Sequence, residues 1–127
     1  MKAYLTTYKF YYDNKLMSSR CYTQLRESPY EEEYSGADFE GLWDLTYKWS
    51  VVIPLNMWES KKGKKFLEDY GYAFFGRKIT SKNCKPWKFT ITSEETAISM
   101  DRLMKFDTEK VIQYLKERGI TTCPILK

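Results

Sequence analysis

The first residues of the chain alternate between aromatic or β-branched side chains and polar ones. Five side chains share one face at a period of two: Tyr4, Thr6, Tyr8, Phe10 and Tyr12. Because successive side chains of a strand point to opposite faces, this pattern predicts a half-buried strand over residues 3–12. Turn-forming residues follow at Asp13-Asn14-Lys15, and a second extended stretch reaches Gln24. The N-terminal segment is therefore predicted to be a β-hairpin.

The pattern changes after this hairpin. Residues 25–37 are polar and acidic without a period, which predicts a loop, and a short helix is expected over 37–44. Residues 45–53 (LTYKWSVVI) are rich in β-branched and aromatic side chains and precede Pro54. This composition favours a strand that ends at the proline.

The middle of the chain is predicted to hold one helix and a second hairpin. Asn56 followed three residues later by Glu59 resembles a capping box, so a helix is expected over 57–70. Residues 72–80 and 87–92 have the composition of strands and are separated by a polar, turn-like segment. Two such strands with a turn between them indicate a hairpin.

Two further helices are predicted in the C-terminal part. Thr92 or Ser93 is expected to cap the first, and Asp107 or Thr108 the second, because these side chains accept hydrogen bonds from helix N–H groups. The apolar residues on one side of the first helix are Ala97, Met100, Leu103 and Met104; those of the second are Val111, Ile112 and Leu115. Gly119 is expected to end the second helix.

Together these elements predict an α+β fold. We expect a mostly antiparallel sheet of about five strands with two or three helices packed on it, and the tail at residues 120–126 forms a last strand. A chain of 127 residues has the length of one ordinary domain. Residues 1–127 are therefore expected to form a single α+β domain.

Composition adds expectations about class and compartment. Aromatic residues make up 17% of the chain, far more than in a disordered protein. No stretch approaches the roughly 20 apolar residues that cross a bilayer, and the N-terminal alternation differs from the apolar block of a signal peptide. Cys21, Cys84 and Cys123 are far apart, which indicates neither a disulfide framework nor a zinc ribbon. We expect a soluble, cytoplasmic protein.

The chain contains no histidine. Without one it cannot form a Ser-His-Asp or Cys-His site, a histidine-ligated metal centre or an imidazole general base. Chemistry based on carboxylates, lysine or tyrosine remains, as does a function without catalysis. We expect a protein that is not an enzyme and that carries no cofactor or metal.

Charge is distributed unevenly, and this changes the expected function most. Residues 1–50 hold six basic and eight acidic side chains, residues 51–92 hold nine and three, and residues 93–127 hold six of each. The middle third therefore has a net charge of +6, although the whole chain has only +4. Such a concentration favours an anionic partner.

The middle third is rich in both basic and aromatic side chains, which favours binding to phosphates and bases. Clustered lysines neutralise phosphates, and aromatic rings stack on unpaired bases. The candidate partner-binding residues are Lys61, Lys62, Lys64, Lys65, Arg77, Lys78 and Lys82, with Trp58, Tyr72 and Trp87 as stacking or hot-spot residues.

Within this region, Gly71-Tyr72-Ala73-Phe74-Phe75 resembles the centre of the RNA-recognition-motif signature. The resemblance implies that Tyr72 and Phe74 project from a strand and stack on bases. Outside these five residues the chain departs from the signature, because Tyr70 occupies the basic position and Arg77 the last aromatic one.

The working hypothesis is a small non-enzymatic protein that binds a nucleic acid or a protein that handles nucleic acid. In general character the chain is similar to accessory proteins of bacteriophages, which implies an alternative role as a protein inhibitor of a host or defence nucleoprotein. The acidic residues between 31 and 44 are expected to be a solvated loop or a contact for a basic partner. A metal-dependent enzyme based on carboxylates and lysine, and a subunit of a larger assembly, are further alternatives.

Overall fold

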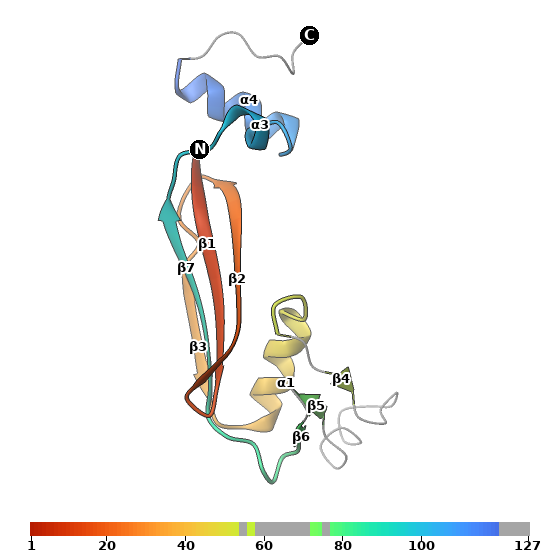
Figure 1. Cartoon of the computed structure of the whole chain (residues 1–127). Coiled ribbons are helices and arrows are strands. Elements are labelled where there is room, and N and C mark those ends of the chain that lie inside the picture. Colours follow the sequence, from red (N-terminus) through yellow and green to blue (C-terminus); the bar gives the residue numbers. More distant parts are fainter. Residues whose placement is uncertain (54–55, 58–71, 75–76, 120–127) are drawn as a thin grey trace. The chain divides into compact units, whose positions relative to one another are not determined.

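The structure, a computed structural model of the chain, describes residues 1–53, 56–57, 72–74 and 77–119. The chain divides into two compact units (Figure 1). The terminal unit comprises Met1–Thr7, Cys21–Glu32 and Ile91–Lys127, and the central unit comprises Tyr8–Arg20 and Glu33–Thr90.

Two sheets and three helices make up the described part of the fold. The larger sheet has the order β2-β1-β7-β3, formed by β1 (Lys2–Tyr12), β2 (Lys15–Arg26), β3 (Glu32–Gly36) and β7 (Trp87–Glu95). The smaller has the order β4-β5-β6, formed by β4 (Asn56–Met57), β5 (Tyr72–Phe74) and β6 (Arg77–Ile79). The helices are α1 (Phe39–Lys48), α3 (Met100–Leu103) and α4 (Thr108–Glu117). The predicted α+β class with an antiparallel sheet is confirmed.

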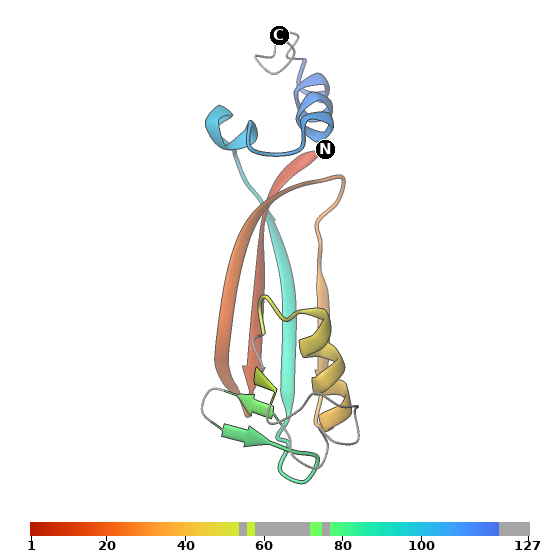
Figure 2. The same ribbon diagram turned by 90° about the vertical axis from the view of Figure 1, so that its right-hand side faces the viewer.

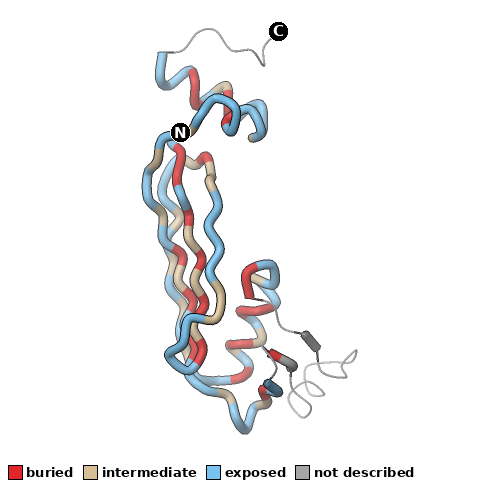
Figure 3. The backbone as a smooth tube through the Cα atoms, viewed as in Figure 1, coloured by how far each residue is buried: buried red, intermediate tan, exposed pale blue. Residues whose placement is uncertain are grey.

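The N-terminal hairpin is also confirmed. Along β1 the even-numbered side chains from Tyr4 to Tyr12 are buried, as the period of two predicted (Figure 3). Asp13 and Asn14 connect β1 to β2 with φ angles of 52° and 63°. Two successive residues in the left-handed region match the two-residue turn whose twist fits a hairpin, and Asp and Asn tolerate that region best after glycine.

Helix α1 covers most of the short helix that was predicted over residues 37–44 and replaces the first part of the strand that was predicted over 45–53; residues 49–53 form a turn and a bend. It begins after Asp38, whose side chain accepts a hydrogen bond from the Gly41 N–H at 2.9 Å, and it continues to Lys48. The buried residues Phe39, Leu42 and Leu45 recur at helical spacing, so the apolar face extends past the predicted end of the helix. The strand prediction was wrong because β propensity is weaker than this continued helical face.

Strand β3 replaces part of the loop that was predicted over residues 25–37. Its half-buried positions, including Tyr34, alternate with the exposed Glu33 and Ser35. The Tyr34 ring stacks on Phe89 with their centroids 6.3 Å apart. Because β3 is an edge strand, its carboxylates reach solvent, and a charged sequence is therefore compatible with strand structure.

The second predicted hairpin is wrong. Strand β7 lies between β1 and β3, and residues 72–80 form two short strands that pair with each other, with Phe74 opposite Arg77. A continuous strand would place Phe74 and Ile79 on opposite faces, since they are five residues apart. The antiparallel pairing places both on one face, and both are buried.

Aromatic side chains fill the core of the central unit. Phe74 contacts Phe10 and Tyr12 edge to face, each with ring centroids 5.6 Å apart, and Trp49 packs on Phe89 at 5.4 Å. Helix α1 lies against this part of the sheet in both views (Figures 1 and 2). These aromatic contacts hold the end of β1 that leads into the hairpin turn.

In the terminal unit, β7 extends to Glu95 and so includes the two residues that were expected to cap a helix. Ser93 instead bonds Tyr30, accepting from its N–H at 3.1 Å and donating to its carbonyl at 2.8 Å. The first helix is the single turn α3, which Ser99 caps. Of its predicted inward residues, Leu103 is buried, whereas Met100 and Met104 are exposed.

Helix α4 follows the prediction closely. Asp107 caps it, Val111 and Leu115 are buried, and Gly119 follows the helix with a φ of +71°. These side chains pack with Ala3 and Leu25. The helix is also tied to the chain start, because Arg118 Nη1 donates to the Met1 carbonyl at 2.9 Å.

Two predicted elements lie wholly or largely outside the described residues. One is the helix over 57–70, of which the structure describes only Met57, as part of β4. The other is the last strand over 120–126. Among the helices of the described part, none is long and apolar enough to span a membrane.

Candidate functional site

The turn after β6 presents lysines on a backbone held by Asn83. The Asn83 Oδ1 atom accepts a hydrogen bond from the Thr80 N–H at 2.6 Å, and its Nδ2 donates to the Lys78 carbonyl at 2.9 Å. The Lys82 N–H donates to Thr80 Oγ1 at 3.3 Å. Asn side chains commonly stabilise turns in this way. The exposed Lys82 therefore lies on a turn of fixed shape, with the exposed Lys78 before it in β6 and Lys85 after it.

The same turn is joined to the tip of the N-terminal hairpin. The Lys85 N–H donates to the Tyr12 hydroxyl at 2.8 Å, and the Asp13 N–H donates to the Pro86 carbonyl at 2.8 Å. Both bonds join residues more than seventy positions apart. They bring the basic turn beside the hairpin tip within the central unit.

Between them lies a hollow of about 230 Å³, which we call the basic hollow. Its lining comes from three segments: Tyr12 and Asp13 of the hairpin, Arg77, Lys78 and Ile79 of β6, and Asn83 and Lys85 after the turn. Among the described residues that line it, three are cationic (Arg77, Lys78 and Lys85) and one is a carboxylate (Asp13), so this part of the lining has an excess of positive charge. Such an arrangement attracts anions.

Two titratable groups beside the hollow stay neutral at neutral pH. Burial is the main cause that raises the pKa of the Tyr12 phenol. Burial also raises the pKa of the Cys84 thiol, and the negative charge of Asp38 adds to this effect. Since both ordinary pKa values lie above 7, neither group cancels the charge of the lysines.

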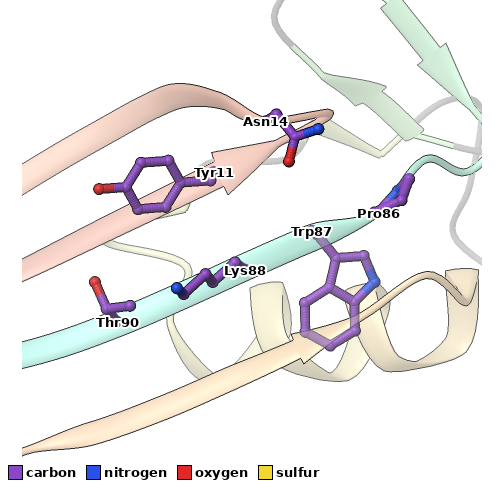
Figure 4. Close-up of a pocket in the computed structure, with 6 residues that line it drawn as sticks. All are labelled: Tyr11, Asn14, Pro86, Trp87, Lys88 and Thr90. Carbon is purple, nitrogen blue, oxygen red and sulfur yellow. The ribbon is translucent and has the colours of Figure 1, made fainter.

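A second hollow, of about 390 Å³, lies on the outer face of the sheet, and we call it the outer hollow (Figure 4). It is lined by Tyr11, Asn14, Pro86, Lys88 and Thr90, and also by Trp87, most of whose side chain is buried in the core. Tyr11, Asn14 and Thr90 were not among the candidate residues. The period of two in β1 points to Tyr11, because a strand with one buried face presents its other side chains on the opposite face. Asn14 belongs to the hairpin turn, and Thr90 lies in β7 between the buried Phe89 and Ile91.

The predicted partner-binding residues have different positions. Arg77 and Lys78 line the basic hollow, and Lys82 is exposed on the adjoining turn. Tyr72 lies in β5 opposite Ile79. The remaining lysines and a tryptophan are outside the described residues: Lys61, Lys62, Lys64, Lys65 and Trp58.

Trp87 packs in the core rather than standing on the surface. It is 8% exposed, and its indole N–H donates to the Asp38 carbonyl at 3.0 Å. Its ring occupies the space beside Gly36 and Gly41, where an added Cβ would lie 2.6 and 2.8 Å from Trp87 Cζ2. The ring therefore supports the start of α1, and its face is not available to stack on a base.

Phe74 has a similar outcome. It is 1% exposed and contacts Phe10 and Tyr12, so it cannot stack on a base as the resemblance to the RNA-recognition motif implied. The alternation of residues along a strand does not show which of its two faces is buried, so a buried aromatic and an exposed one have the same sequence pattern.

One residue of the acidic segment, Glu33, forms an ion pair with Lys88 of the outer hollow. Glu33 Oε1 lies 3.1 Å from Lys88 Nζ, and both side chains are at least half exposed. Among the described residues, no group of three or more acidic or cysteine side chains is arranged to hold a metal ion. Cys21 and Cys84 are both unpaired by disulfide.

Comparison of the chain with protein-family models, with curated proteins and with solved structures finds no match in any of the three.

Proposed function

We propose that this protein is a non-enzymatic binding protein that engages a nucleic acid, or a protein that handles nucleic acid, through the central unit. The observation that carries the proposal is the basic hollow, where Arg77, Lys78 and Lys85 converge beside the Asn83-held turn. Cations on a fixed backbone lose less conformational freedom on binding than cations on a mobile loop. We expect the protein to act in the cytoplasm.

The charge of the two units supports the same surface. Over its full range the central unit contains thirteen basic and eight acidic residues, a net charge of +5, whereas the terminal unit contains eight and nine, a net charge of −1. A polyanion is therefore attracted to the central unit at long range. Phosphate contacts of this kind give affinity with little sequence preference.

The test is binding to a labelled single-stranded oligonucleotide and to a duplex over a series of salt concentrations. The site variant carries Lys78→Ser, Lys82→Ser and Lys85→Ser, and the matched control carries Lys105→Ser, Lys110→Ser and Lys116→Ser, all exposed in the terminal unit. A further variant replaces Lys61, Lys62, Lys64 and Lys65 with Ser and tests the lysine cluster outside the described residues.

We expect log affinity to fall linearly with log salt for the natural sequence. Each lost phosphate contact reduces the slope by about 0.7 for single strands, so the site variant should have a slope shallower by about 2. The control variant should keep the natural slope. Absence of binding at low salt, or equal losses in the site and control variants, would show that these lysines are solvated surface residues.

A protein partner is the second candidate, and a specific surface favours it. On α1, Tyr47 is 78% exposed, Val51 just after the helix is 76% exposed, and Trp43 stacks on Tyr47 with centroids 5.5 Å apart. Exposed aromatic and aliphatic side chains of this kind are typical of protein contacts. An inhibitor of a nucleoprotein would lose affinity for that target on Tyr47→Ser and Val51→Ser and keep it in the lysine site variant.

A further inference from the structure

The outer hollow lies where two strands place their side chains directly opposite each other. The Asp13 N–H bonds the Pro86 carbonyl, which pairs these residues across antiparallel β1 and β7. Counting two residues along each strand places Tyr11 opposite Lys88, and two more place Lys9 opposite Thr90. The intervening Phe10 and Phe89 are fully buried, so Tyr11 and Lys88 share the opposite, outer face, as Figure 4 shows.

The residues around this hollow combine three kinds of chemistry. Tyr11 is half-buried and contributes an aromatic ring, Lys88 contributes an exposed cation, and Asn14 and Thr90 contribute an amide and a hydroxyl. The volume of about 390 Å³ lies within the range of about 300–1,000 Å³ that is usual for small-ligand sites. A ring can stack on the face of a base, a cation can pair with a phosphate, and the amide and hydroxyl can hydrogen-bond polar groups of the nucleotide.

We propose that the outer hollow holds one unpaired base of a single-stranded nucleic acid, stacked on Tyr11, with Lys88 on the adjoining phosphate. This inference rests on the proposed function and specifies its ligand. A base in a duplex is stacked on both faces and paired along one edge, so its face cannot reach Tyr11 unless the duplex opens. The site therefore distinguishes single strands from duplexes, which the basic hollow alone does not.

The phosphates of a bound nucleic-acid strand can reach further cations beyond Lys88. Lys88 and Lys85 lie on either side of Pro86, and Lys85 lines the basic hollow with Arg77 and Lys78. Lys88 contacts Glu33 in the absence of ligand, but ion pairs between exposed side chains stabilise by only about 0–1 kcal/mol. A phosphate can therefore replace the carboxylate at small cost.

The experiment measures binding of a labelled oligothymidine and of a duplex of the same length to three variants. Tyr11→Leu removes the ring, Tyr11→Phe keeps it, and Tyr22→Leu removes an exposed tyrosine of the terminal unit. We expect Tyr11→Leu to weaken single-strand binding by about 5- to 150-fold, the equivalent of about 1–3 kcal/mol per stacked base, and to leave duplex binding unchanged. Tyr11→Phe and Tyr22→Leu should bind as the natural sequence does.

The salt series separates this inference from the proposed function. Tyr11→Leu removes no charge, so its plot of log affinity against log salt should be displaced without a change of slope. Lysine-dependent binding with Tyr11→Leu unaffected would overturn the stacking site and leave the proposed function standing. Absence of any binding to nucleic acid would overturn the stacking site and direct binding of nucleic acid together, and would leave a protein partner as the remaining form of the proposed function.

A measurement on the unaltered protein guards against a variant that fails to fold. Ultraviolet irradiation of the complex with an oligonucleotide containing 5-iodouracil crosslinks aromatic side chains that stack on the base, and mass spectrometry locates the linked peptide. We expect the crosslink on Tyr11. Crosslinks confined to other tyrosines would contradict the proposal.

Discussion

At the scale of single residues, the contact of Trp87 with two glycines gives the sharpest prediction. In most helices Gly→Ala stabilises by about 0.5–1 kcal/mol. At Gly41 a Cβ would lie 2.8 Å from the Trp87 ring, so we expect Gly41→Ala to destabilise the protein by about 1–3 kcal/mol. Urea denaturation of the variant and of the natural sequence measures the difference.

The control is Gly41→Ala in a protein that also carries Trp87→Leu. Trp87→Leu removes the ring atoms that the new Cβ would meet, so Gly41→Ala should cost less in that background than in the natural sequence. An equal cost in both backgrounds would mean that the clash is not with Trp87.

The raised pKa values of Cys84 and Tyr12 lead to a prediction of how stability changes with pH in the alkaline range. Burial raises the pKa of both groups, so each releases its proton more readily from the unfolded chain than from the folded protein. Their stabilising contribution is therefore complete below the pKa of the unfolded state and is lost as the pH rises above about 9. The free energy of unfolding should decrease over this range and should decrease less steeply in Cys84→Ala. Urea titrations from neutral to alkaline pH test this, and parallel curves for the two proteins would contradict it.

At the scale of elements, the hairpin turn couples stability to charge. Asp13 has a φ of 52° and also lines the basic hollow. Asp13→Ala should destabilise the protein by about 1 kcal/mol, because ordinary side chains disfavour the left-handed region. Asp13→Asn should keep the stability and tighten binding to an oligonucleotide at low salt, because it keeps the turn and removes a negative charge. Weaker binding by Asp13→Asn would show that the carboxylate contributes to the contact.

The elements that could be predicted from the sequence are those specified by local interactions. The β1–β2 hairpin follows from a strict period of two and an Asp-Asn turn, and α4 follows from its cap, its apolar face and Gly119. The errors lie where tertiary contacts decide. Residues 45–48 have strand composition but extend α1, and the acidic β3 is a strand because Tyr34 packs on Phe89.

The candidate site shows the same division. Charge patterning indicated Arg77, Lys78 and Lys82 correctly as exposed basic residues, but composition cannot distinguish a surface aromatic from a buried one. Trp87 was therefore expected on the surface although it is buried, and Phe74 is buried although the resemblance to the RNA-recognition motif implied that it stacks on bases. Tyr11 was overlooked because only the pairing of β1 with β7, which is a long-range contact, places it opposite Lys88.

At the scale of the whole molecule, the separation of charge predicts where a ligand should protect the backbone. The central unit has a net charge of +5 and the terminal unit −1, so an oligonucleotide should bind the central unit alone. Amide hydrogen exchange with and without oligothymidine measures this. We expect slower exchange at β6 and the Asn83-held turn, and unchanged exchange in α4, which belongs to the terminal unit.

The experiment also separates local contact from general stabilisation. A ligand that stabilised the fold as a whole would slow exchange in the most protected amides of both units alike. Protection confined to the central unit should disappear at high salt, because phosphate contacts are lost as counterions compete. Protection that persists at high salt, or that centres on α4, would contradict the assignment of binding to the basic hollow and the Asn83-held turn.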